Sequence, residues 1–454
     1  MPQRRQNNWQ HSIDRRKFLA SVGASGALAL AGCTGDDGDG GNGNGNGNGN
    51  GNGNGNGNGN GDGNGNGNGN GNGDGTTGSG SMEFTVGVIT ARSGSYSFLG
   101  EAEFEGAQLA RQHLEEEENV TIEIVTEDTE TDPSTGQERM QRLVNREGVD
   151  FALGGVSSSV AIQMGRWASD NGVAYMAAGS HSDATTGEQC AENMYRPTCS
   201  NSMLANAMGE AMYDTADSWV IMYADYTWGQ TGEAAVRNSL QEAGGTVVDS
   251  IPTPFPNDDY TQYLNEASDL DAEGLAVVIA GTTQRIVTQQ FFDGGFDQEF
   301  EMAGPLHEEA VFWGLDKEIA AETGVWATPY ANCVPHTDLG EQFVDEIVEE
   351  FDSSPFSRHE MGYLSMDQLV RAALRAGSSD AGEIRAELEG YELDRTIKEG
   401  DHYWRDDHQL IQPVDTITAL PVEEMQDDPY QSWYQHNTRK EGDEVARADS
   451  GCGL

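Results

Sequence analysis

Three short segments rich in serine carry the side chains that could bind a small molecule. They span residues 93–97, 156–159 and 179–182. Serine hydroxyls and backbone N–H groups donate hydrogen bonds to a carboxylate or carbonyl without adding a competing charge. Serine is also a common helix N-cap, so a capping role is an equal alternative for any one of these residues. The segments therefore predict a small-molecule site and leave the part of each serine open.

The sequence around these segments predicts the elements that position them. Short β-branched or apolar runs at 85–89, 151–154 and 174–178 precede the segments, and longer helical patterns separate the runs. This alternation is typical of βαβ units in a parallel sheet. Because ligands bind beyond the carboxyl ends of such strands, we expect the three serine segments to converge there.

The same alternation of strand and helix patterns continues along the chain and indicates a second lobe. Further strand patterns lie at 219–223, 246–250, 275–280 and 325–329. The continuous apolar run at 275–280 is typical of a strand buried on both faces. The chain has 454 residues, which is enough for two lobes of ordinary size. The sequence therefore predicts an α/β fold of two Rossmann-like, doubly wound lobes.

Several short motifs give the chain a resemblance to a known family. They are residues 86–89 followed by Ser93-Gly94, and then 100–107, 154–159, 225–229 and 404–409. In order and spacing they resemble the type I periplasmic binding proteins, specifically the branched-chain amino acid (Leu/Ile/Val) binding proteins of ABC transporters and their amide- and urea-binding relatives. The resemblance covers about residues 84–420. It implies that a small amino-acid-like solute is captured between two lobes and delivered to an ABC permease.

The resemblance also implies how the chain divides. In this family the chain crosses between the lobes three times. Lobe 1 is then expected at 84–200 plus 330–407, and lobe 2 at 201–329 plus 408–425. The acidic residues 426–454 lie beyond the resemblance and are set apart as a C-terminal tail without an assigned role.

Ligand-binding residues are carried over from the family's motifs. The resemblance assigns to the ligand, from the first lobe, Ser158, Ser159, Gly179, Ser180 and His181. Trp228 falls where the family places an aromatic ring that closes over the ligand from the second lobe.

One departure from the family concerns the group that holds an ammonium. Amino-acid binders of this family commonly place a glutamate directly after a Gly-Pro pair, whereas here Gly304-Pro305 is followed by Leu306. Either Glu308 or Asp225 takes this role, or the ligand is an amide, a urea-like molecule or another less cationic solute.

The N-terminal residues predict export and anchoring. Arg15 and Arg16 form a twin-arginine motif before an apolar run that is too short to span a membrane, so residues 1–32 are expected to be a signal peptide. The run ends in a sequence that resembles a lipobox, with Cys33 as the lipidated residue. The Gly-Asn repeats within 33–82 cannot form a core and predict a flexible tether. The expected location is the outer face of the cell membrane.

The charge indicates a saline habitat, and an oxidising exterior makes disulfides plausible among the cysteines. Acidic residues outnumber basic residues 76 to 25, and the net charge of −51 argues against binding nucleic acid. Such self-repulsion is tolerable in strong salt, and the composition resembles that of halophilic archaea. The four cysteines other than Cys33 permit three pairings, and a disulfide between Cys190 and Cys199 is expected because they lie nine residues apart.

Two other functions are weighed against solute delivery. An enzyme is not expected, because the chain has no Gly-x-Ser-x-Gly elbow, no Walker phosphate loop and no His-Glu-x-x-His motif. For the same reason no catalytic residue, metal or cofactor is assigned. A sensor that presents its ligand to a membrane transducer remains an alternative, because transporters and transducers would both read the closed lobes.

Overall fold

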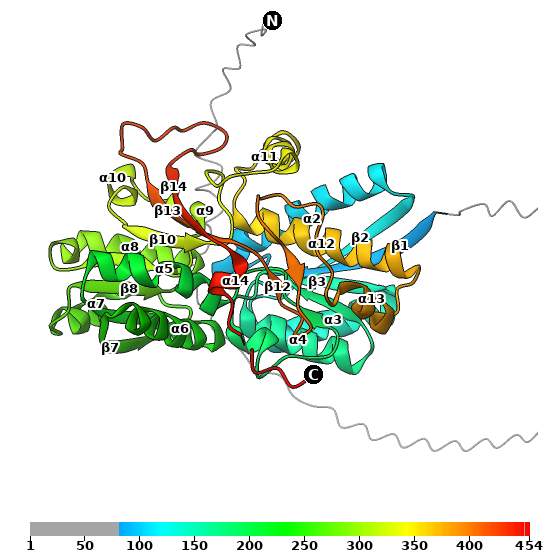
Figure 1. Cartoon of the computed structure of the whole chain (residues 1–454), viewed down its shortest axis with the longest axis horizontal. Coiled ribbons are helices and arrows are strands. Elements are labelled where there is room, and N and C mark those ends of the chain that lie inside the picture. Colours follow the sequence, from blue (N-terminus) through cyan, green and yellow to red (C-terminus); the bar gives the residue numbers. More distant parts are fainter. Residues whose placement is uncertain (1–80, 449) are drawn as a thin grey trace, which may run out of the picture. The chain divides into compact units, whose positions relative to one another are not determined.

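The computed structural model describes residues 81–448 and 450–454, which belong to one compact unit (Figure 1). The predicted signal residues Arg15 and Arg16, the predicted lipidation site Cys33 and most of the tether lie outside these described residues. Within the described part of the chain, no helix is both long and apolar enough to cross a membrane.

The first lobe is built on a five-stranded parallel sheet in the order β2-β1-β3-β4-β5. Its strands are β1 (Met82–Thr90), β2 (Val120–Asp128), β3 (Phe151–Gly154), β4 (Ala174–Ala177) and β5 (Met194–Tyr195). The helices that accompany it are α2 (Ser97–Glu117), α3 (Pro133–Arg142), α4 (Ser158–Asp170), α11 (Asp338–Phe351), α12 (Ser357–Ala376) and α13 (Ala381–Leu388). Helix α12 packs along α2, so a late segment of the chain completes this lobe.

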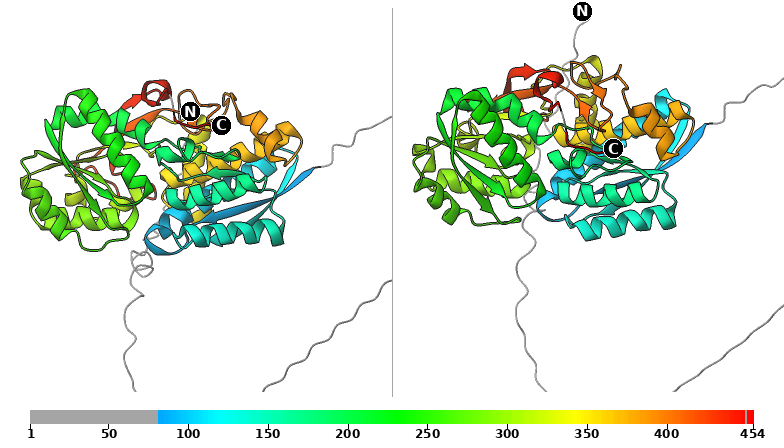
Figure 2. Two further views of the ribbon diagram at one scale, coloured as in Figure 1. Left: turned by 90° about the horizontal axis from the view of Figure 1, so that it is seen from below. Right: turned by 60° about the horizontal axis from the view of Figure 1, so that its bottom comes forward.

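The second lobe is built on a seven-stranded sheet in the order β14-β13-β10-β9-β8-β6-β7. Its parallel strands are β6 (Ser218–Ala224), β7 (Thr246–Thr253), β8 (Gly274–Val278), β9 (Glu301–Gly304) and β10 (Val325–Thr328). Its helices are α5 (Asn201–Thr215), α6 (Thr227–Ala243), α7 (Thr261–Ser268), α8 (Gly281–Asp293), α9 (Glu309–Phe312) and α10 (Lys317–Ala320). Figure 2 shows this green lobe beside the blue and cyan strands of the first lobe. The predicted α/β fold of two doubly wound lobes is confirmed.

The segment predicted to be a C-terminal tail is instead part of the second lobe. Strand β14 (Tyr434–Lys440) pairs with β13 (Val414–Ala419) in an antiparallel register at the edge of the sheet. Helix α14 (Gly442–Val445) then packs on α5. The prediction was wrong because a partly solvated edge strand can be polar, so β14 carries no run of apolar residues.

The chain passes between the lobes through three crossovers, which follow β5, β10 and β12 (Leu410–Ile411). Strand β12 pairs with β11 (Tyr403–Trp404) in a separate two-stranded sheet. Lys398 is 1% exposed, and its ammonium donates hydrogen bonds to the carbonyls of Pro329 and Pro413. These carbonyls belong to the second and third crossovers, so one buried lysine ties the two together.

The predicted disulfide between Cys190 and Cys199 is wrong. Cys190 is bonded to Cys452, with an S–S distance of 2.11 Å and a Cα–Cα distance of 5.7 Å. Cys199 is a fully buried free thiol in the first crossover, and its sulfur lies 4.0 Å from the carbonyl oxygen of Pro413. Proximity in sequence misled the prediction, because β5 carries the chain away from Cys190 before Cys199 is reached.

Candidate functional site

The two lobes meet through the loops at the carboxyl ends of their parallel strands. The Ser159 hydroxyl donates to the Thr227 hydroxyl at 3.0 Å, which joins the first turns of α4 and α6. The hydroxyls of Tyr96 and Tyr226 lie 2.6 Å apart and join the loops after β1 and β6. Ring contacts continue from both tyrosines to Phe255, at centroid distances of 5.0 and 4.9 Å. The lobes are therefore closed on each other at the edge where the sequence predicted a ligand.

The predicted serines are buried within the first lobe. The Ser158 hydroxyl accepts from the backbone N–H of Ser182 at 3.3 Å, and the Ser180 and Thr185 hydroxyls lie 2.6 Å apart. Ser158 is 1% exposed and Ser180 is fully buried. Capping by Ser157 does not occur at α4, because its side chain makes no cap hydrogen bond. These hydroxyls thus stiffen the loops that carry the other site residues.

A buried arginine, Arg358 in the first turn of α12, links the two lobes. Its Nη1 donates to Glu103 Oε1 at 3.2 Å and to the carbonyl of Gly179 at 3.0 Å. Its Nε donates to Glu308 Oε1. Glu103 lies on α2 of the first lobe, whereas Glu308 follows β9 of the second lobe, so the second ion pair crosses the interface. The other oxygen of Glu103 accepts from the Thr90 hydroxyl at 2.7 Å.

The three charged groups of this cluster are held in a water-poor environment. The side chains of Arg358, Glu103 and Glu308 are at most 2% exposed. Burial raises the pKa of Glu103, although the guanidinium of Arg358 opposes this effect. Burial lowers the pKa of Arg358, but the charges of Glu308 and Glu103 outweigh it and hold that pKa above its usual value. Each buried carboxylate therefore needs the guanidinium of Arg358 beside it, because an unpaired buried charge is costly.

Gly179 has a structural reason to be glycine. A Cβ atom built on it would lie 2.0 Å from Nη1 of Arg358 and 2.1 Å from Oε1 of Glu103. Any side chain at this position would therefore displace the ion pair. The predicted ligand contact at Gly179 is, in the structure, a carbonyl that accepts from Arg358.

His181 presents a hydrogen-bond acceptor to the interior. Its Nδ1 lies 2.8 Å from the carbonyl oxygen of Cys199, and a carbonyl only accepts, so Nδ1 carries the proton. Burial and, to a lesser degree, the charge of Arg358 lower the pKa of His181 well below its usual value, so the ring is neutral. Nε2 is therefore an acceptor, and it has no hydrogen-bond partner among the described residues.

The second lobe contributes two more buried polar atoms without a described partner, an acceptor on Glu308 and a donor on Trp228. Glu308 is fully buried, and its Oε2 has no hydrogen-bond partner within residues 81–448 and 450–454. The indole N–H of Trp228 is likewise buried and unpaired within that part of the chain. Trp228 is 3% exposed, and its ring centroid lies 6.2 Å from that of Tyr226. Buried polar atoms of this kind need a partner, and a bound solute between the lobes can supply it.

The comparisons with known proteins agree with this geometry. The profile of the periplasmic binding proteins matches residues 83–419. The chain belongs to the periplasmic binding protein family. This family consists of solute-binding proteins, which are not enzymes. No similar sequence was found among curated proteins.

Several solved structures share the fold. A periplasmic binding protein from Burkholderia mallei is 21% identical with a TM-score of 0.76, over 83% of this chain and 100% of that chain. An amino acid ABC transporter substrate-binding protein from Pseudomonas fluorescens is 17% identical with a TM-score of 0.73, over 82% and 99%. A solute-binding protein of an ABC transporter from Rhodopseudomonas palustris, solved with 3,4-dihydroxybenzoic acid, is 18% identical with a TM-score of 0.68, over 79% and 98%. At these identities the likeness establishes the fold.

The structure brings together most, but not all, of the predicted site residues of this family member. Gly179 and Glu308 both contact Arg358, whose charge also acts on His181. Asp225 is exposed, and its carboxylate accepts from the Gln230 side chain at 3.0 Å. Of the two acids predicted to hold an ammonium, Glu308 is thus the buried one.

Four residues described at this site were not among the predicted site residues. Tyr96 and Tyr226 lie within motifs that were recognised, and their aromatic rings were the signal that could have found them. Glu103 also lies within a recognised motif, residues 100–107, whereas Arg358 gave no local signal; each gains its role only through a partner far away in the sequence.

Proposed function

We propose that this chain is the extracytoplasmic substrate-binding component of an ABC importer, and that it encloses a small amino-acid-like solute between its lobes. The observation that carries the proposal is the pair of buried acceptor atoms without a partner among the described residues, Nε2 of His181 and Oε2 of Glu308. They come from opposite lobes, so a solute that donates to both stabilises the closed form.

The chemistry of these atoms favours a solute with N–H donors. A carboxylate and a neutral imidazole nitrogen accept hydrogen bonds, and an ammonium satisfies both while balancing the excess negative charge of two glutamates against one arginine. The indole N–H of Trp228, which has no partner in the described part of the chain, suits a carboxylate or carbonyl of the same solute. Amides and urea-like molecules offer N–H donors without the charge and remain the second candidate class.

A calorimetric panel in molar salt tests this proposal. The solutes are leucine, valine, short amides, urea, benzoate and a dicarboxylate. We expect a zwitterionic or neutral N–H donor to bind in the micromolar range or tighter, about −8 kcal/mol or better. Tight binding of benzoate or the dicarboxylate with none of the N–H donors would refute the proposed ligand class.

Two matched variants identify the acid that the solute contacts. Glu308→Gln is expected to weaken an ammonium-bearing solute by about tenfold to a hundredfold, because a charge-assisted hydrogen bond is lost. Asp225→Asn serves as the control, since that side chain is exposed. If the solute is an amide, Glu308→Gln should have a smaller effect while Asp225→Asn still has none.

The anchor is tested separately in a host with twin-arginine export. A Cys33→Ser chain is expected to lose lipid labelling and to appear in the medium, because its thiol would be the attachment point. Cys333→Ser is the matched control and should remain with the membrane. Membrane retention of Cys33→Ser without lipid would contradict lipid anchoring at this residue.

Delivery to a permease and presentation to a membrane transducer use the same closed lobes. Uptake of the identified solute by cells lacking this chain separates the two roles. Lost uptake indicates delivery to the permease, whereas normal uptake with a lost behavioural response indicates sensing.

A further inference from the structure

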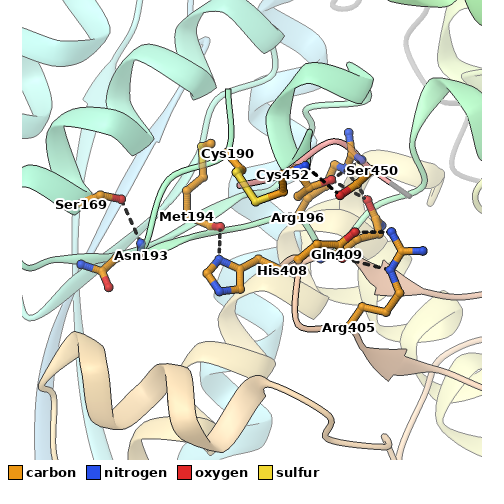
Figure 3. The surroundings of a disulfide bond; sticks show 12 residues. Ser169, Cys190, Asn193, Met194, Arg196, Arg405, His408, Gln409, Ser450 and Cys452 are labelled. Carbon is orange, nitrogen blue, oxygen red and sulfur yellow. Dashed lines mark hydrogen bonds and ion pairs between the residues drawn. A yellow bond between two sulfur atoms is a disulfide. The ribbon is translucent and has the colours of Figure 1, made fainter. Parts of the chain in front are cut away.

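The end of the chain makes a fourth connection between the lobes. Strand β14 and helix α14 belong to the second lobe, where the Val445 carbonyl accepts from the Asn206 side chain of α5 at 2.8 Å. Seven residues later, Cys452 is bonded to Cys190, which lies just before β5 of the first lobe. Figure 3 shows this disulfide beside Met194 and His408. The chain therefore returns to the lobe in which it began.

We call residues 446–452, of which position 449 is not described, the C-terminal strap. Side chains of residues 405 and 407 contact the strap before and after position 449. Arg405 donates to the carbonyl of Arg447 at 2.6 Å, and the Ser450 hydroxyl donates to the Asp407 carboxylate. The strap is thus held by hydrogen bonds as well as by the disulfide.

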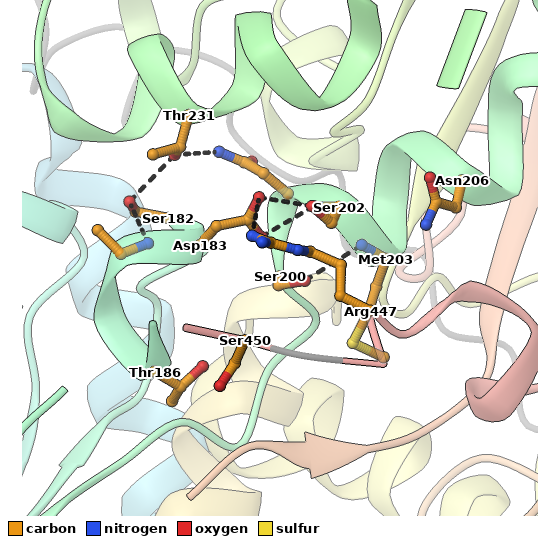
Figure 4. Close-up of polar contacts among 12 residues, drawn as sticks. Ser182, Asp183, Thr186, Ser200, Ser202, Met203, Asn206, Thr231, Arg447 and Ser450 are labelled. Atoms are coloured by element: carbon orange, nitrogen blue, oxygen red, sulfur yellow. Dashed lines mark hydrogen bonds and ion pairs between the residues drawn. The ribbon is translucent and has the colours of Figure 1, made fainter. Parts of the chain in front are cut away.

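The strap lies over the hinge. A cavity of about 20 Å³ is lined by residues of the first crossover, of the segment leading to the third, and of the strap, including Arg196, Ser200, Gln409, Ile411, Ala446 and Ser450. Nη1 of Arg447, in the strap, lies 3.9 Å from Oδ2 of Asp183 (Figure 4). The same carboxylate oxygen accepts from the Ser202 hydroxyl of α5 at 2.6 Å. Strap, first lobe and second lobe therefore meet at one point beside two crossovers.

The disulfide fixes this arrangement covalently. Cys190 precedes all three crossovers and Cys452 follows them, at a sequence separation of 262. The bond therefore closes a ring that contains the whole hinge. Without it, the contacts described for the strap with residues 405–407 and Asp183 would be hydrogen bonds and an ion pair near the surface, and strong salt screens such an ion pair.

We propose that the strap is a covalently fixed fourth hinge connection, which restricts how the two lobes rotate apart and which is released when the Cys190–Cys452 bond is reduced. A dithiol reductant attacks one sulfur, forms a mixed disulfide and then closes into its own cyclic disulfide, leaving two protein thiols. Both cysteines are partly exposed and accessible to such a reagent. This inference is independent of the identity of the solute.

The test is hydrogen exchange on the full chain without added solute, before and after treatment with dithiothreitol. The reporter is the peptide that contains the Asn201 amide, because that N–H donates across the lobes to the His181 carbonyl at 2.7 Å. We expect its exchange to become about tenfold faster after reduction, while peptides from β1 keep their rate. Cys452→Ser should show the same increase without reductant and no further change with it.

Thiol mapping and scattering complete the experiment. Iodoacetamide is expected to modify Cys190 and Cys452 only after reduction, while Cys199 resists, since burial raises the pKa of its thiol to about 12. The radius of gyration from small-angle X-ray scattering should increase in the reduced protein. The proposal is overturned if only peptides 446–454 exchange faster, with the Asn201 peptide and the radius of gyration unchanged. Because the folded wild-type protein is reduced in place, a folding defect of Cys452→Ser does not affect this outcome.

Discussion

Replacing Arg358 with methionine is expected to lower the free energy of unfolding by about 3–5 kcal/mol, because two carboxylates would stay buried without their cation. Glu103 and Glu308 are both fully buried, so neither can turn to water in the closed form. Urea denaturation at fixed salt measures the change. Arg375→Met on the same helix is the control, since its pair with Glu387 is partly exposed and should contribute less than about 1 kcal/mol.

A second variant separates loss of charge balance from loss of packing. Adding Glu103→Gln to Arg358→Met removes one of the two unpaired charges and should restore part of the stability. If Arg358→Met costs no more than Arg375→Met, the cluster does not carry the interlobe ion pair that the structure assigns to it.

The contribution of Glu309 to the free energy of unfolding is expected to fall as the pH rises from about 5 to 8. Buried histidines act in the opposite direction, because burial lowers the pKa of His181, His307 and His402. The contribution of Glu309 is therefore read from the difference between the wild-type protein and Glu309→Gln. The Glu309 side chain is 2% exposed, and burial raises its pKa from 4.5 to about 8, with a backbone hydrogen bond from Asn332 opposing the shift. The folded state thus holds the proton more tightly than the unfolded state. This contribution is complete below the unfolded pKa and is lost as the pH rises through the folded pKa, with a total of about 5 kcal/mol.

Denaturation curves at several pH values for Glu309→Gln check this expectation. The neutral amide should remove the contribution of Glu309, so the free energy of unfolding of the wild type should fall relative to that of the variant as the pH rises. Glu360, whose pKa burial raises to about 7, affects both proteins alike. Glu350→Gln, at an exposed position, should retain the full slope. A Glu309→Gln protein whose stability changes between pH 5 and 8 just as that of the wild type does would contradict the argument.

The two lobes could be predicted because buried parallel strands impose a pattern on the sequence. Every residue of β8 is buried, which requires the continuous apolar run that was recognised. Strand β14 imposes no such pattern, because one edge and much of its surface meet solvent. The Cys190–Cys452 bond was equally hidden, since only the fold brings residues 262 positions apart together.

The candidate site was predicted in its location better than in its chemistry. Loops after parallel strands converge at the carboxyl ends of the strands, whichever residues they contain. The serine segments therefore indicated the correct edge of the sheet. Gly179 was expected to contact the ligand, yet its lack of a side chain makes room for Arg358. That arginine could not be predicted, because its partners come from positions 103, 179 and 308 and meet only in the closed form.

A crystal structure of the protein with the tightest solute of the panel tests the central claim most directly. We predict that the solute lies between the lobes and that its donor groups lie within about 3.2 Å of Nε2 of His181 and Oε2 of Glu308. A solute bound on an outer face of either lobe, with those two atoms contacted only by water, would contradict the account.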